Sequence, residues 1–69
     1  MSEFTIQPDD RLINIREVEF ISGASRATIY RRMKAREFPL CARIGPGSVR
    51  WLESEVRAWI VQKLGTRRA

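Results

Sequence analysis

Two short segments with helical periodicity, separated by only three residues, constrain the fold of this chain more than any other feature. The first, about residues 15–22, repeats apolar side chains at helical spacing, and Gly23 can end it in the left-handed conformation. The second begins after Ser25, a favourable N-cap, and no Gly or Pro interrupts it up to Arg36. Two helices joined by a short glycine-containing turn are typical of a helix-turn-helix.

The first helix also carries a local start signal. Asn14 followed three residues later by Glu17 forms a capping-box pattern, and Ile13 is placed to pack against Val18 as a hydrophobic staple. Pro39 ends the second helix at the latest, because proline cannot continue one.

From residue 40 the sequence alternates with a period of two, which predicts a β-hairpin around a turn at residues 45–48. We expect one face of the first strand to hold Leu40, Ala42 and Ile44. We expect the other face to hold Cys41 and Arg43, while Val49 and Trp51 alternate with Arg50 on the return strand. A hairpin after a helix-turn-helix corresponds to the wing of a winged helix.

A third amphipathic helix is expected at about residues 53–64, with an acidic first turn and Gly65 as its end. Trp51 and Trp59 lie on apolar stripes and are expected to anchor the core. The predicted fold is therefore mainly α: a winged helix-turn-helix of about three helices and a two-stranded hairpin. Its predicted organisation is a flexible acidic leader at 1–10, the domain at 11–64 and a basic tail at 65–69.

Charge is unevenly distributed along the 69 residues. Lys and Arg number 13 against 8 Asp and Glu, which gives a net charge of +5. Residues 1–10 hold three of the acidic side chains and no basic one, so the rest of the chain carries 13 basic against 5 acidic residues. Eleven of the 13 are arginines, which suit planar contacts with phosphates and guanines. A basic body of this kind points to a polyanionic partner.

The sequence lacks the residues that other classes of function require. There is no histidine for general base catalysis and no phosphate-binding glycine loop, so we do not expect an enzyme. The single Cys41 can form neither an intramolecular disulfide nor a zinc site without Cys or His partners. We expect no cofactor, metal or small-molecule ligand. Apolar runs of three or four residues do not predict a membrane span, so the expected location is cytoplasmic.

The second helix is the candidate site for DNA. Opposite its apolar side, Ala27, Arg31 and Lys34 share a face with Thr28 nearby, and the short side chains allow close approach to base edges. Ser25 and the free N–H groups of the first turn can hold a phosphate. The predicted DNA-contacting residues are Ser25, Arg26, Ala27, Thr28, Tyr30, Arg31, Arg32 and Lys34 from the helix, and Arg43 and Arg50 from the hairpin. A solvated basic face on an ordinary helical domain is the alternative interpretation.

The two hairpin arginines are expected to share the face away from the apolar residues of the first strand. There Arg43 and Arg50 suit the DNA backbone or a neighbouring minor groove. In the leader, Phe4 and Ile6 are candidates for a contact between neighbouring copies, with a frayed terminus as the simpler alternative.

Four stretches together resemble the AlpA family of phage and prophage regulators: Asn14–Val18, Ser22–Arg31, Glu37–Pro39 and Trp51–Ile60. The resemblance runs from about Arg11 to Lys63, and the family is similar to excisionases and to the DNA-binding domain of MerR regulators. It implies a winged helix-turn-helix that either switches on an integrase gene or acts as a recombination directionality factor. Gly47 and Ser48 stand where relatives often carry an arginine, which argues against minor-groove insertion by the hairpin tip.

The predicted partner is double-stranded DNA, at an attachment site or a promoter, with the protein associated with the nucleoid when bound. An integrase is a candidate second partner, and one short recognition helix favours several copies on repeated sites, or a dimer. The rival hypothesis is a protein-interaction module that binds an integrase, a repressor or a polymerase subunit. Single-stranded nucleic acid is a weaker third possibility, because the sequence lacks an exposed aromatic row.

Overall fold

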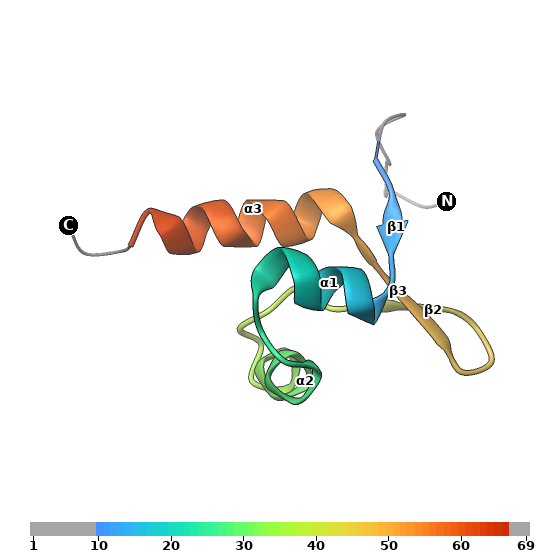
Figure 1. Cartoon of the computed structure of the whole chain (residues 1–69). Helices are drawn as coiled ribbons and strands as arrows, with labels where there is room; N and C mark the ends of the chain where they lie inside the picture. Colours follow the sequence, from blue (N-terminus) through green and yellow to red (C-terminus); the bar gives the residue numbers. More distant parts are fainter. Residues whose placement is uncertain (1–9, 67–69) are drawn as a thin grey trace, which may run out of the picture.

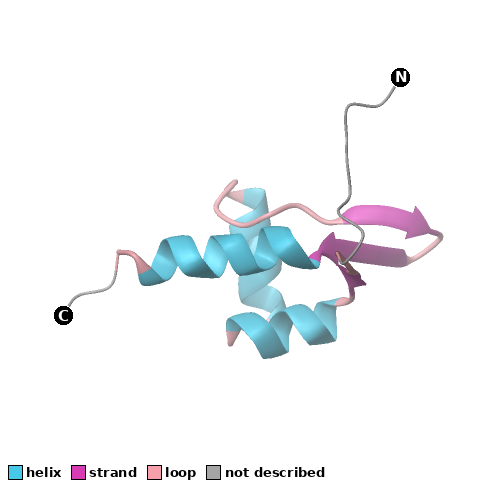
Figure 2. Cartoon of the chain, turned by 90° about the horizontal axis from the view of Figure 1, so that it is seen from above, coloured by secondary structure: helices cyan, strands magenta, loops and turns pink. Residues whose placement is uncertain are grey.

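The computed structural model describes residues 10–66 and has the expected architecture of three helices and a hairpin. Its elements are β1 (Leu12–Ile13), α1 (Ile15–Ser22), α2 (Arg26–Lys34), β2 (Ala42–Gly45), β3 (Ser48–Leu52) and α3 (Glu53–Leu64). In Figure 1, α1 lies beneath α3, α2 lies lowest and is seen end-on, and the hairpin extends to the right. Figure 2, from above, shows α2 crossing under α3. The winged helix-turn-helix prediction is confirmed.

The first helix forms where its local signals predict. The Asn14 side-chain oxygen accepts a hydrogen bond from the Glu17 N–H at 3.0 Å, and Gly23 ends the helix with a φ of 74°. Ile13 and Val18 both belong to the buried core, as expected of a staple. Because these signals lie within a few residues of each other, the sequence alone predicted the bounds of α1.

The second helix ends at Lys34, although no Gly or Pro interrupts the segment up to Arg36. Arg36 adopts a φ of 61°, the left-handed conformation that glycine normally supplies. The Glu37 N–H donates to the Arg32 carbonyl at 2.7 Å and the Arg36 N–H to the Met33 carbonyl at 3.0 Å, which is a Schellman motif. A left-handed arginine costs roughly 1–2 kcal/mol, so this end of α2 is held by its hydrogen bonds against a conformational penalty.

The core lies where the three helices meet the sheet. Its buried side chains come from every element except β2, and one comes from the loop after α2: Ile13, Val18, Ile29, Phe38, Trp51 and Val56. Trp51 has no exposed surface, so its predicted role in the core is confirmed. The equal role expected of Trp59 was only partly right, because Trp59 is half-buried at the edge of this cluster.

Both tryptophans hold the segment between α2 and β2. The Trp51 indole N–H donates to the Pro39 carbonyl at 3.0 Å, and the Trp59 indole N–H donates to the Glu37 carbonyl at 2.9 Å. The Trp59 ring also packs on Phe38, with 4.7 Å between ring centroids. This segment therefore has a fixed path, which sets the position of the hairpin relative to α2.

The sheet has one strand more than the sequence analysis expected. The short strand β1 pairs antiparallel with β3, and the strand order is β1-β3-β2. Ile13 lies opposite Trp51 in this pairing, and both side chains are buried. A strand of two residues is too short to show an alternation of apolar and polar side chains, so the local sequence does not predict β1.

The predicted faces of the hairpin were wrong. Cys41 and Val49 pack against the core, whereas Leu40 and Ile44 are 55% and 52% exposed. The strand that carries Trp51 sets the inward face, because the buried ring fixes the alternation along β3 and hence on its partner strand. The apolar spacing of Leu40, Ala42 and Ile44 therefore marks the outer face.

The N-terminus of α3 is capped by residues far away in sequence. The Glu53 N–H donates to the Arg11 carbonyl at 2.8 Å, and Asp10 accepts from the Ser54 N–H at 3.2 Å and from its hydroxyl at 2.7 Å. These bonds, with the Ser54 hydroxyl as the main cause, lower the pKa of Asp10 below its ordinary value. Asp10, assigned to the leader from sequence, thus holds the start of α3, while Phe4 and Ile6 lie outside the described residues.

Candidate nucleic-acid interface

The outer face of α2 has the composition predicted for it. Ala27, Arg31 and Lys34 are exposed, and Ile29 on the opposite side is fully buried. No acidic residue occurs in this helix. The helix therefore presents two cations and one small side chain to solvent from its most prominent surface.

At the N-terminus of α2, more backbone N–H groups are hydrogen-bonded to side chains than the sequence analysis assumed. The Ser25 hydroxyl accepts from the Thr28 N–H at 3.2 Å and donates to the Thr28 hydroxyl at 2.9 Å. The Arg26 N–H donates to the carboxylate of Glu19 at 2.9 Å. The expectation of free N–H groups for a phosphate was thus wrong for two donors of the first turn, because side chains already fill them.

Glu19 is the residue that sequence reasoning missed at this site. It lies in the last turn of α1 and reaches across the three-residue connection to the start of α2. An acidic residue a short turn before a helix start is the available signal, because a carboxylate is favourable at a helix N-terminus. Its negative charge lies beside the face that would meet DNA.

Arg26, Tyr30 and Trp51 contact one another in series, from the surface of α2 into the core. The Arg26 guanidinium lies 5.8 Å from the centre of the Tyr30 ring, and Tyr30 meets Trp51 edge-on at 6.0 Å. Tyr30 is 36% exposed, in keeping with its predicted place at the edge of the buried face. Tyr30 gives Arg26 an aromatic support, which restricts its motion while its charge stays accessible.

Arg32 points in a different direction from Arg31. Its guanidinium lies 5.8 Å from the centre of the Trp59 ring on α3, where the Lys63 ammonium also lies, at 5.5 Å. The structure therefore brings Arg32 together with Lys63, a residue that the sequence analysis did not single out, and separates it from the outer face of α2. These two cations extend the basic surface from α2 towards the end of α3.

The hairpin arginines do not share a face, which corrects the sequence analysis. Arg50 lies opposite Ala42 in the strand register and Arg43 lies opposite Val49, and directly opposed residues share a side of an antiparallel pair. The bulge between Arg43 and Gly45 shifts the register near the tip. Arg50 also donates from Nη1 to the Val49 carbonyl at 2.8 Å, which holds its guanidinium against the strand.

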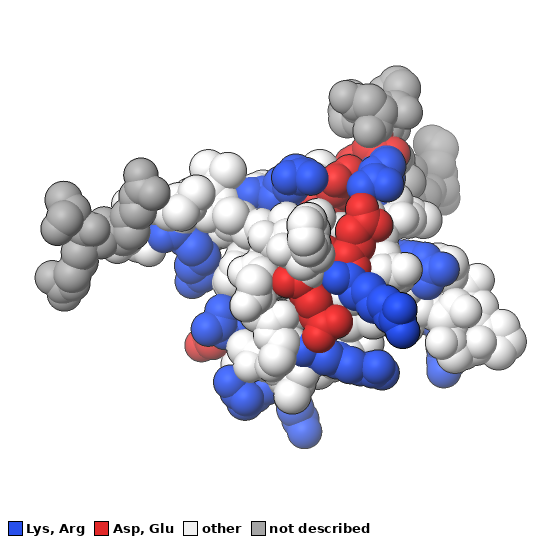
Figure 3. Space-filling view, in the orientation of Figure 1, with Lys and Arg blue, Asp and Glu red and all other residues white. Residues whose placement is uncertain are grey.

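All ion pairs among the described residues lie away from α2 and the hairpin. Arg11 pairs with Glu17 and Glu53, and Arg57 pairs with Glu53. The hydrogen bond from Arg11, followed by that from Arg57, lowers the pKa of Glu53, and the same pairing raises the pKa of Arg11. Figure 3 shows acidic side chains in a band across α1 and the start of α3, with basic side chains along the lower edge, where α2 lies.

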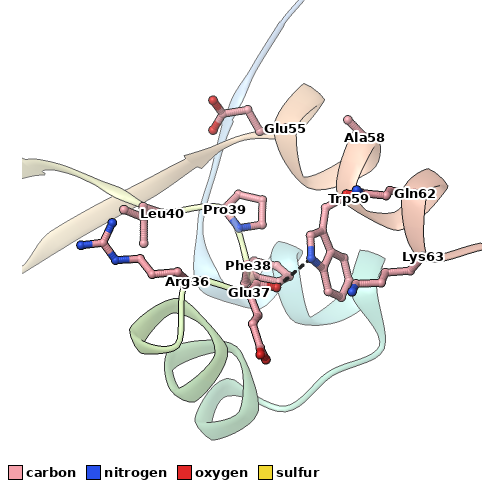
Figure 4. Close-up of a pocket in the computed structure, with 10 residues that line it drawn as sticks. All are labelled: Arg36, Glu37, Phe38, Pro39, Leu40, Glu55, Ala58, Trp59, Gln62 and Lys63. Atoms are coloured by element: carbon pink, nitrogen blue, oxygen red, sulfur yellow. Dashed lines mark hydrogen bonds between the residues drawn. The ribbon is translucent and has the colours of Figure 1, made fainter. Parts of the chain in front are cut away.

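A shallow groove of about 780 Å³ runs between α3 and the segment that follows α2. Figure 4 shows the Trp59 ring on one wall and Pro39 and Phe38 on the other, with the indole bonded to the Glu37 carbonyl. Charged side chains of both signs, among them Arg36, Glu55 and Lys63, surround these apolar residues. The groove thus carries charges of both signs, whereas every charged residue of α2 is basic.

Within residues 10–66, no group of His, Cys, Asp or Glu side chains is arranged to hold a metal ion. None of the helices in this part of the chain has the length and apolar character that a membrane span requires.

Comparisons with known proteins agree with the resemblance seen in the sequence. Residues 11–64 match the profile of a family described as the prophage CP4-57 regulatory protein (AlpA). The uncharacterized protein ORF88 of Enterobacteria phage P4 is 37% identical over 59 residues, which cover 86% of this chain and 67% of that protein. No solved structure matches the chain. The matched region contains every helix and strand of the structure.

Proposed function

We propose that this chain, which belongs to the AlpA family of prophage regulatory proteins, acts by binding duplex DNA. The exposed face of α2 enters the major groove, and the hairpin contacts the adjoining backbone. In this proposal, a regulatory protein acts directly on the DNA that it controls.

The charge distribution carries the proposal. Five basic residues and no acidic one lie between residues 25 and 36: Arg26, Arg31, Arg32, Lys34 and Arg36. Arg11 and Arg57, in contrast, are paired with carboxylates. Among residues 10–66, none of these five cations takes part in an ion pair. Their mutual repulsion is unfavourable, and a polyanion relieves that repulsion by binding there.

The centre of the outer face of α2 contacts the base edges in this proposal. Arg31 can donate two hydrogen bonds to the O6 and N7 atoms of a guanine, and Ala27, one turn earlier, leaves room for the helix to approach. Arg26, Lys34 and the hairpin arginines are then left for phosphates, which position the protein but carry no sequence information.

Two regulatory roles fit such a protein: activation of an integrase gene, or control of excision as a directionality factor. A single short recognition helix gives limited specificity against a genome, so several copies on repeated sites, or a dimer, would bind together. Footprinting on the attachment site and on the integrase promoter of the host element distinguishes these roles. Protection of only one of the two sites identifies the role.

A salt titration tests DNA binding itself. If about five to seven phosphates are neutralised, the logarithm of the association constant falls with the logarithm of salt concentration with a slope of about −4.5 to −6. Fluorescence anisotropy with a labelled duplex, measured between low and physiological salt, gives this slope. A slope near zero would remove duplex DNA as the ligand.

The groove beside Trp59 favours a second candidate function, a protein-interaction module. Its apolar residues suit an apolar side chain of a partner such as an integrase, a repressor or a polymerase subunit. Ala58→Gln narrows the groove without changing charge, and Arg31→Ala alters only the basic face. DNA binding is the main function if Arg31→Ala abolishes regulation while Ala58→Gln preserves it, and the reverse pattern identifies an adaptor.

A further inference from the structure

The tip of the hairpin combines an exposed apolar side chain with a local break in strand pairing. Arg43 pairs with Val49 and Gly45 pairs with Ser48, so Ile44 is the extra residue of a β-bulge. Ile44 lies on the outer face of the hairpin and is 52% exposed, although isoleucine is usually buried. The hairpin thus presents an apolar side chain to solvent near its end.

The turn beyond the bulge is narrow. Pro46 and Gly47 occupy its two central positions, and the φ of 70° at Gly47 is the conformation that a type II turn requires there. A ring at Pro46 and no side chain at Gly47 give the tip a small cross-section with an apolar lining. Such a shape fits between base pairs or into a minor groove, which is about 6 Å wide.

The surroundings of the tip favour a nucleic acid over a protein as the occupant. Arg43 and Arg50 flank Ile44 in the hairpin, one on each face. In Figure 3 the hairpin tip is an uncharged surface next to basic side chains, and in Figure 1 the tip and α2 form the lowest parts of the molecule. A duplex bound by α2 would therefore run close to the tip, with arginines placed for its phosphates on either side.

We propose that Ile44, supported by Pro46, is an apolar wedge that enters the minor groove and partly unstacks one base step next to the site read by α2. This inference rests on the proposed function, because the wedge acts only on a bound duplex. Gly47 and Ser48 replace an arginine at the tip, which argues against insertion through a polar contact, but the wedge inserts through the apolar side chain of Ile44 instead. Apolar side chains that unstack a step kink the duplex, and flexible TpA steps are unstacked more easily than A-tracts.

The wedge gives the hairpin a sequence preference without base hydrogen bonds. Wild-type protein would bind a duplex with a TpA step beside the α2 site about tenfold more tightly than one with an A-tract there, because the A-tract resists kinking. Ile44→Ser would bring that ratio close to one, whereas Ile44→Leu, which keeps a wedge of similar volume, would retain it.

The experiment uses two 30-base-pair duplexes that differ only in the TpA step or the A-tract, with 2-aminopurine in place of the adenine next to the step. Unstacking raises 2-aminopurine fluorescence, so wild type and Ile44→Leu should raise it on the TpA duplex and Ile44→Ser should not. Val61→Ser, which changes another exposed apolar residue but on α3, is the matched control and should behave as wild type. Circular dichroism melting confirms that each variant is folded.

The outcomes separate the wedge from the proposed function. If wild type binds the duplexes but Ile44→Ser gives the same fluorescence and the same TpA preference, the wedge is wrong and DNA binding stands. If Ile44→Ser reduces self-association in sedimentation while the fluorescence response persists, Ile44 contacts another copy of the chain and the wedge is likewise overturned. If wild type binds neither duplex at low salt, both the wedge and the proposed function fail.

Discussion

Arginines on two sides of this molecule have different surroundings. Arg11 and Arg57 share the carboxylate of Glu53, and Arg11 also pairs with Glu17, so these ion pairs connect the residue before β1 with α1 and α3. On the α2 side, Arg31 and Lys34 are exposed on a helix without acidic residues. The same residue type therefore stabilises the fold on one side and is left available for a ligand on the other.

The largest expected effect separates Arg31 from Arg57. Arg31→Ala should weaken binding to the cognate site by about 1–3 kcal/mol and relax discrimination at one or two base pairs, because it removes a bidentate base contact. Arg57→Ala removes the same charge from α3 and should leave DNA binding nearly unchanged while lowering the melting temperature. Anisotropy titrations and thermal melts of both variants check this. Similar losses of affinity in the two would show that only net charge matters.

Lys34→Ala should have a smaller and less selective effect than Arg31→Ala. A phosphate is present in every sequence, so affinity for cognate and random duplexes should fall by the same factor. The salt slope should become shallower by about 0.9, the contribution of one neutralised phosphate. Titrations of both duplexes at several salt concentrations measure this. A loss confined to the cognate duplex would instead make Lys34 a base-reading residue.

Glu19 lies on α1 and contacts the start of α2, so it connects the side of the molecule that holds the ion pairs with the basic helix. Glu19→Gln keeps an acceptor for the Arg26 N–H but removes a negative charge beside the helix that we propose to face DNA. A carboxylate roughly 4–8 Å from a phosphate costs about 0.5–1 kcal/mol of repulsion in water, so affinity for any duplex should rise about two- to fivefold. Glu17→Gln, the same change within the paired network, is the control and should mainly lower the melting temperature. Equal gains in affinity for both variants would contradict a special position of Glu19.

The features that the sequence predicted are local ones. The cap at Asn14, the turn at Gly23 and the cap at Ser25 each depend on residues a few positions apart, so the bounds of α1 and the start of α2 could be read directly. The outer face of α2 followed from helical periodicity because its buried side is anchored at Ile29. The identity of the basic face thus needed no tertiary information.

The features that were missed depend on distant partners. Asp10 meets Ser54 across 44 positions of sequence, and β1 exists only because β3 lies beside it. The hairpin faces were misassigned because the burial of Trp51, and not the apolar spacing of β2, sets the strand alternation. The direction of Arg32 depends likewise on Trp59 of α3. Pairwise geometry of this kind leaves no signal in a single stretch of sequence.

The smallest expected effect is a dependence of stability on pH that comes from Asp10 and Glu53, on the side of the molecule that holds the ion pairs. Hydrogen bonds from Ser54 to Asp10 and from Arg11 to Glu53 lower the pKa of both carboxyls below their usual values of 3.8 and 4.5. A lowered pKa means that the folded state binds its proton more weakly than the unfolded state, so the stabilisation is complete above the usual pKa values. It is lost as pH falls from about 5 through the lowered values in the folded state.

Asp10→Asn isolates one of these two groups, because asparagine cannot titrate and keeps an acceptor for the Ser54 N–H. The melting temperature of wild type should fall more steeply below pH 5 than that of Asp10→Asn, while the two curves should run parallel at neutral pH. Arginine and lysine stay protonated throughout this range, so the basic face does not contribute to the difference. Circular dichroism melts at half-unit pH steps measure both curves. Identical acid dependence of the two proteins would show that the Asp10 cap does not stabilise the start of α3 through its charge.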